Sequence, residues 1–190
     1  MLILGSKLIG IPIMGLQTGT KLALTKTAII NPSNLCIVAY EVAGPLLSIR
    51  PAYLRIADVR ELSPVGLIID SDDELIGKDD VIVIQKILDL NFNLIGMNVI
   101  DENKSKIGKI INYTVEAESF TIQQIMVKPN IIKSISKSEL LIHRSQIVEI
   151  NNSAIIVKSA TVKPDQSKPE QVKPSYVNPF RQQNPQTNNS

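Results

Sequence analysis

The stretch LIGMNVIDENKSKIGKIINYTV, residues 94–115, shows how this chain is built. Short runs of Ile and Val are interrupted by the polar turn DENKS at 101–105, whose Asp and Asn side chains can bond their own backbone. A further apolar segment, FTIQQIMV at 120–127, follows a turn around Glu118 and Ser119. Short β-branched segments separated by polar turns are typical of strands. The stretch therefore predicts a β-hairpin over 106–116 and 120–127.

Similar segments occur earlier in the chain at a nearly constant spacing. The matches are LIG at 8–10 and 94–96, KLA at 21–23 and KIG at 106–108, LCIVAYEV at 35–42 and FTIQQIMV at 120–127, and ADVRELSPVGLII at 57–69 and SQIVEINNSAIIV at 145–157. Two units are too few for a solenoid, so the pattern favours a duplicated small domain. The first unit carries its own predicted hairpin, 21–30 and 35–42, joined by the turn NPSN.

The fold class predicted from these segments is all-β, with two small β-barrels in tandem, because short strands in a small unit avoid exposed edges by closing. Strand 120–127 has no cleanly polar face, so we expect one face to line a barrel and the other to meet the sister domain or another chain. Helical spacing over 79–91 predicts a short helix at the joint, and one-turn helices are expected near 55–58 and 143–146.

These elements divide the chain into four predicted regions. They are a first barrel at 1–78, a helical joint at 79–93, a second barrel at 94–160 and a tail at 161–190. The tail is rich in Pro, Gln and Asn, with Pro at 164, 169, 174 and 179, and is predicted to be disordered because it cannot bury enough apolar surface. Two interpretations of its large apolar residues stay open: with Arg181 as an added donor, Tyr176, Val177 and Phe180 form a short partner-binding motif, or they are part of a solvated tail without a binding role.

Composition narrows the class of protein. The chain has 190 residues, of which 44% are hydrophobic, so a substantial core is expected. A net charge of +2 argues against a protein whose main role is binding nucleic acid, although lysines make the second unit mildly basic. We therefore expect a protein partner rather than RNA. No stretch approaches the roughly 20 apolar residues that span a bilayer, and we expect a cytoplasmic protein with peripheral membrane attachment left open.

The residue types that support catalysis or metal binding are scarce. The single histidine, His143, is expected to be structural or on the surface, because adjacent turn residues rarely make a nucleophilic triad. The single cysteine, Cys36, lies inside a strand pattern and is expected to be buried and inert. The acidic run from Asp70 to Asp80 fails the calcium-loop pattern, since position six is Leu75. The sequence predicts no catalytic residue, no metal and no cofactor.

Residues 94–115, together with SELLIHRSQIVEINNSAIIVKSA at 138–160, resemble the PRC-barrel family. The first unit resembles it more loosely and keeps the same order, including DVRELSPVGLIID at 58–70. The pair is similar to bacterial tandem PRC-barrel proteins. The family includes the cytoplasmic part of the photosynthetic reaction centre H subunit and the C-terminal domain of a ribosome maturation factor. The resemblance implies small all-β barrels used for binding.

The sequence thus predicts a non-enzymatic adaptor that binds a protein partner. Two alternatives stay open. One is a factor for assembly of the small ribosomal subunit, binding a ribosomal protein or rRNA. The other is an adaptor associated with the membrane or the division apparatus.

Overall fold

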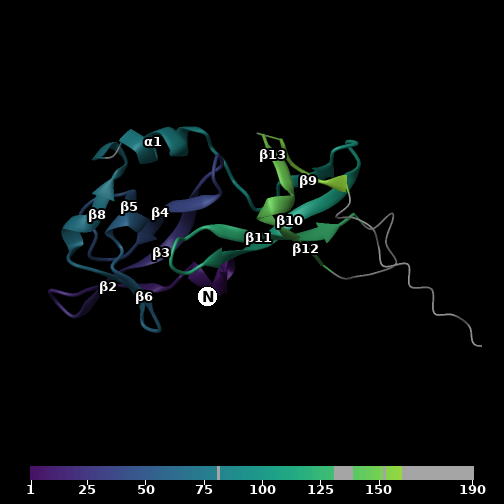
Figure 1. Cartoon of the computed structure of the whole chain (residues 1–190). Helices are drawn as coiled ribbons and strands as arrows, with labels where there is room; N and C mark the ends of the chain where they lie inside the picture. The colour runs from purple at the N-terminus through teal and green to yellow at the C-terminus, as the bar shows by residue number, and fades with distance from the viewer. Residues whose placement is uncertain (81, 131–138, 152, 160–190) are drawn as a thin grey trace, which may run out of the picture.

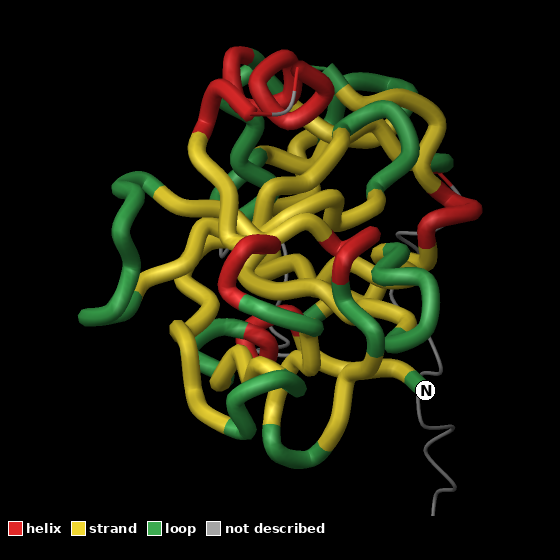
Figure 2. Tube along the Cα trace, turned by 90° about the vertical axis from the view of Figure 1, so that its left-hand side faces the viewer, coloured by secondary structure: helices red, strands yellow, loops and turns green. Residues whose placement is uncertain are grey.

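The computed structural model describes residues 1–80, 82–130, 139–151 and 153–159. Strands make up most of this part of the chain, and helices are confined to short connecting segments (Figure 2). The strands form two seven-stranded sheets that lie side by side (Figure 1). The predicted all-β class is therefore confirmed. The predicted disordered tail at 161–190, with its proposed motif, lies outside the described residues.

The first sheet has the strand order β6-β7-β2-β3-β4-β5-β8. Its strands are β2 (Pro12–Gly15), β3 (Thr20–Asn31), β4 (Cys36–Ala43), β5 (Ala52–Arg55), β6 (Glu61–Ser63), β7 (Gly66–Ile69) and β8 (Leu75–Gly77). The predicted hairpin of 21–30 and 35–42 is the β3–β4 pair, and NPSN forms its turn. In that turn the Asn31 side chain accepts a hydrogen bond from the Ser33 amide at 3.0 Å, which fixes the reversal.

The second sheet has the order β12-β11-β10-β9-β14-β13 and carries β1 as an additional partner of β10. Its strands are β1 (Leu2–Leu4), β9 (Asn98–Asp101), β10 (Lys106–Glu116), β11 (Ile122–Pro129), β12 (Leu140–His143), β13 (Ile147–Ile150) and β14 (Ala154–Val157). Six strands follow the same order as in the first sheet, including one parallel pair in each, β2 with β7 and β9 with β14.

The two long hairpins are interrupted at equivalent places. Lys26 is an extra residue in β3 opposite β4, and Ile111, 85 positions later, is the extra residue in β10 opposite β11. Val38 and Gln123 are related in the same way on the partner strands. Each bulge shifts the side-chain alternation by one residue. This explains why 120–127 has no cleanly polar face, since both Ile122 and Ile125 are buried.

The core is built from Ile, Val and Leu, as the composition predicts. Leu8 and Leu94, from the two LIG segments, are both buried. Each is followed by a glycine with positive φ, Gly10 at 78° and Gly96 at 87°. The Gly10 amide donates to the Thr25 carbonyl and the Gly96 amide to the Ile110 carbonyl, each at 2.8 Å. The same turn therefore leads into β2 and into β9, and glycine supplies its left-handed conformation without strain.

Helical segments occur close to where the sequence predicts them. The joint contains α1 (Ile82–Asp89), preceded by the 3₁₀ turn η4 (Lys78–Asp80). The predicted one-turn helices are η2 (Ile56–Asp58) and η5 (Arg144–Gln146), and further 3₁₀ turns are η1 (Gly5–Leu8) and η3 (Asp72–Glu74). Ile84 and Ile87 bury the apolar face of α1. Figure 1 shows α1 above the first sheet, with the chain then crossing to the second.

The N-terminal strand crosses between the two sheets. Leu2, Ile3 and Leu4 pair antiparallel with Glu116, Val115 and Thr114 of β10. The pattern of the sequence does not predict that the first strand of the chain pairs in the second sheet. The division into 1–78, 79–93 and 94–160 stays a prediction, with the addition that residues 2–4 complete the sheet formed by the later part of the chain.

Candidate functional site

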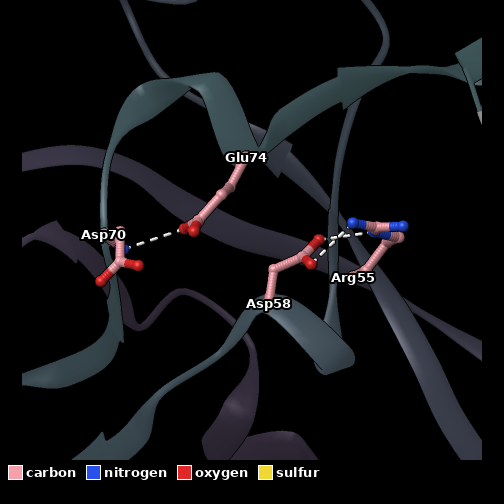
Figure 3. Close-up of polar contacts among 4 residues, drawn as sticks. All are labelled: Arg55, Asp58, Asp70 and Glu74. Carbon is pink, nitrogen blue, oxygen red and sulfur yellow. Dashed lines mark hydrogen bonds and ion pairs between the residues drawn. The ribbon is translucent and has the colours of Figure 1, made fainter.

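His143 has a structural position on the surface. Its Nδ1 accepts a hydrogen bond from the Ser145 amide at 3.2 Å, and its own amide donates to Gln146 Oε1 at 2.8 Å. These two contacts form a capping box at the start of η5. The equivalent helix η2 is closed differently, because Arg55 donates a forked pair of hydrogen bonds to Asp58 (Figure 3). The imidazole of His143 therefore caps a backbone turn.

The acidic run of the first sheet is held by internal hydrogen bonds. The Glu74 carboxylate accepts from the Asp70 amide at 2.9 Å, as Figure 3 shows. Arg60 forms a forked ion pair with Asp70 and holds the pKa of that carboxyl below its usual value. Among the described residues no group of three or more His, Cys, Asp and Glu side chains is arranged to hold a metal ion.

Cys36 is half-buried, which corrects the expectation of a fully buried thiol. It begins β4 at the tip of the first hairpin. The tip of the second hairpin lies directly beside it. Its Sγ lies 3.4 Å from Oγ1 of Thr121, a residue 85 positions later at the tip of the second hairpin. The sequence pattern identified a strand correctly but could not show that Cys36 stands at its end.

The two hairpin tips join the sheets by reciprocal hydrogen bonds. The Ile37 amide donates to the Phe120 carbonyl at 3.0 Å, and the Ile122 amide donates to the Leu35 carbonyl at 2.8 Å. Leu35 and Phe120 are equivalent residues with nearly equal positive φ values, 53° and 51°. Both tips thus take the same backbone conformation and bind each other across the junction.

A second set of contacts joins the N-terminal segment to β10. Gly5 is buried against the Tyr113 ring, so closely that a Cβ at Gly5 would lie 2.3 Å from Tyr113 Cε2. The Asn112 amide side chain donates to Ser6 Oγ at 2.9 Å. These contacts extend the β1–β10 pairing and fix η1 at the junction.

A hollow in the described part of the chain lies at this junction. We call it the junction groove. Its volume is about 610 Å³. Its lining includes the isoleucines Ile9, Ile29, Ile30, Ile87, Ile95 and Ile111. Ile9, Ile95 and Ile111 are 41%, 43% and 37% exposed, respectively, so aliphatic surface from both sheets faces solvent. The volume is in the range of small-molecule sites.

The junction groove is lined by polar side chains as well as by isoleucines, and its two charged side chains are paired with each other. Lys26 and Glu41 form an ion pair at 2.5 Å, and this hydrogen bond raises the pKa of Lys26. Burial raises the pKa of the Tyr113 phenol to about 12, so that this group is neutral at ordinary pH. A paired cation and anion and a neutral phenol leave the junction groove without strong net charge.

The sequence alone does not reveal this groove. Its lining comes from positions that are far apart, and no linear motif marks them. The usable signal was the repeat, since Ile9 and Ile95 occupy matching places in the two LIG segments. The predicted motif of Tyr176, Val177, Phe180 and Arg181 lies outside the described residues and stays a prediction.

Comparisons with known proteins give matches among solved structures alone. No protein-family model and no curated protein matches the chain. Among solved structures, the chain is similar to a protein of Pseudomonas aeruginosa assigned as the 16S ribosomal RNA processing protein RimM. The identity is 18%, the match covers 83% of this chain and 97% of that one, and the TM-score is 0.29. At that score the likeness supports no argument about function.

In the segments that the structure describes, no helix has both the length and the apolar character needed to cross a bilayer.

Proposed function

We propose that this chain is a non-enzymatic adaptor whose junction groove binds a protein partner. The observation that carries the proposal is the aliphatic lining of the junction groove, with three isoleucines more than a third exposed. Exposed apolar surface gathered in a hollow marks interaction sites more often than isolated surface residues do. The proposed setting is the cytoplasm.

The arrangement of the junction supports a rigid binding surface. Reciprocal hairpin contacts and the Gly5–Tyr113 contact hold both walls of the junction groove in place. A preformed groove loses little conformational entropy on binding, which favours affinity. His143 caps a turn, and Cys36 contacts Thr121 at the junction of the sheets. We therefore expect neither His143→Ala nor Cys36→Ser to abolish a reaction of this protein.

The test is affinity capture with the tagged full-length chain, read by mass spectrometry. Ile111→Lys places a charge in the junction groove, while Leu141→Lys alters a 59% exposed leucine on β12 that does not line it. We expect Ile111→Lys to lose the specific partners and Leu141→Lys to retain them. If Ile111→Lys retains every partner, the junction groove is not the binding site. Capture of small-subunit ribosomal proteins would identify assembly as the process served.

A further inference from the structure

The two sheets differ at one equivalent edge, and this difference borders the junction groove. In the second sheet, β1 pairs with the Thr114–Glu116 part of β10. The equivalent part of β3, 85 positions earlier, is Ile29–Asn31. The partner of β3 on that side is β2, which pairs with it through Thr20–Leu24, and the backbone hydrogen bonds of Gly10 and Ile11 with Thr25 end this contact. In the described residues, therefore, no strand pairs with this edge of β3 from Thr27 to Asn31.

The register shows which backbone groups the open edge presents. The Ala117 amide donates to the Met1 carbonyl at 2.9 Å, so this is a hydrogen-bonded pair. Hydrogen-bonded pairs alternate along an antiparallel ladder, which makes Ile3 and Val115 the next such pair. Ile30 is the equivalent of Val115. Its amide and carbonyl therefore point toward the open edge of β3.

Helix α1 covers this end of the first sheet without filling the edge. Ile87 of α1 is buried. It lies 84 positions after Ile3, which is close to the repeat offset of 85. A helix satisfies its own backbone, however, and cannot pair with a strand edge. Residues of both elements line the junction groove, Ile29 and Ile30 from β3 and Ile87 and Leu88 from α1.

We infer that the junction groove binds an extended aliphatic segment of a partner protein, which pairs antiparallel with β3 as Leu2–Leu4 pairs with β10. The inference rests on the proposed function and specifies its partner. The chain's own β1 provides the template, an uncharged strand of three aliphatic residues whose middle side chain, Ile3, packs on the core. Residues 27–30 of β3 extend over roughly 13 Å, enough for such a segment. Strand addition to an open edge is a general mode of peptide recognition.

Amide hydrogen exchange tests the state of the free chain. The Ile30 amide should exchange at least about tenfold faster than the Val115 amide, because one faces an open edge and the other is paired with β1. Equal protection of the two amides would overturn the inference. If the substitution of Tyr176, Val177 and Phe180 by Ala in the full chain then releases Ile30, the occupant is this chain's own tail. If the free chain instead forms a dimer that Ile111→Lys dissociates, the occupant of the open edge is a second copy of this chain.

A peptide probe tests the binding mode. We choose a fluorescent peptide with the sequence of residues 1–7, MLILGSK, and measure anisotropy with the full chain. By analogy with Ile3, N-methylation of the third residue removes a hydrogen bond to β3, whereas N-methylation of the fourth residue modifies an amide that points away. The first change should weaken binding by about tenfold or more, and the second should have little effect.

The outcomes separate the two proposals. If Ile111→Lys loses the captured partners while both N-methylated peptides bind like the parent, the groove is a binding site and strand pairing is wrong. If Ile111→Lys changes neither capture nor peptide binding, the proposed function fails as well. Binding that depends on the third amide and is lost in Ile111→Lys, but retained in Leu141→Lys, supports the inference.

Discussion

Cys36 and Thr121 lie opposite each other in a β-bridge that joins the two sheets. The hydrogen bonds on either side of this bridge come from their neighbours, Ile37 to Phe120 and Ile122 to Leu35. Cys36 and Thr121 are therefore a non-hydrogen-bonded pair, the kind in which opposite Cα atoms lie closest, about 4.5 Å apart.

Thr121→Cys should form a disulfide with Cys36 under mild oxidation. The short Cα separation of such a pair falls within disulfide range. Closing a loop of 85 residues should stabilise the protein by up to about 4.6 kcal/mol, less any strain. Thiol titration and thermal unfolding check this, with Thr121→Ser and reduced protein as controls. Two titratable thiols in the oxidised Thr121→Cys protein would contradict the observed bridge.

Tyr40→Phe should stabilise the protein by about 1 kcal/mol. The Tyr40 hydroxyl is buried without a hydrogen-bond partner in the described structure, and an unsatisfied buried donor is costly. Phe keeps the ring and removes the hydroxyl. Urea unfolding measures the change, and Tyr113→Phe, which alters a ring at the junction groove, is the matched control. A loss of stability in Tyr40→Phe would indicate that its hydroxyl has a partner.

Alkaline pH should destabilise the protein before the folded tyrosines ionise. Burial raises the pKa of Tyr113 to about 12, above the ordinary value of 10.0. The unfolded chain therefore loses its proton first, and the stabilisation present below pH 10 declines as pH rises toward 12. Unfolding free energies at pH 9 and 11 should show a smaller decline in Tyr113→Phe than in the parent. Equal declines would mean that Tyr113 is not a cause.

Gly5→Ala should loosen the N-terminal segment. Its Cβ would meet the Tyr113 ring at 2.3 Å, so the ring or η1 must move, at a cost of about 1–3 kcal/mol. We expect faster exchange of the Val115 amide, because β1 adjoins η1 directly. Lys7→Ala, at an exposed position in the same turn, is the control and should leave Val115 protected. Unchanged Val115 exchange in Gly5→Ala would separate β1 pairing from this contact.

Local features of the fold could be predicted where the sequence itself encodes them. NPSN and the residues around Glu118 both break apolar runs with turn-forming side chains, so both hairpins were predicted correctly. The one-turn helices η2 and η5 also lie where they are predicted, near 55–58 and 143–146, at the start of segments that repeat at an offset of 88.

Features that depend on distant partners could not be predicted. Three apolar residues, Leu2–Leu4, are too few to show periodicity, and nothing in them specifies β10 over β3. The half-buried state of Cys36 depends on Thr121 in the other hairpin. The junction groove arises only when Ile9 and Ile111 are brought together, so it follows from the docking of the sheets.

The parallel pairs β2–β7 and β9–β14 have a consequence for the order of folding during synthesis. In each sheet the two longest strands lie between shorter ones. The second strand of each parallel pair, β7 or β14, is made more than fifty residues after the strand it pairs with. Such distant pairings carry a large loop-closure cost and form slowly. While a ribosome is translating the region after Gly77, the first sheet already has all its strands, but Leu2–Leu4 still lack β10. The nascent chain therefore carries an unpaired aliphatic strand until the second hairpin has been made.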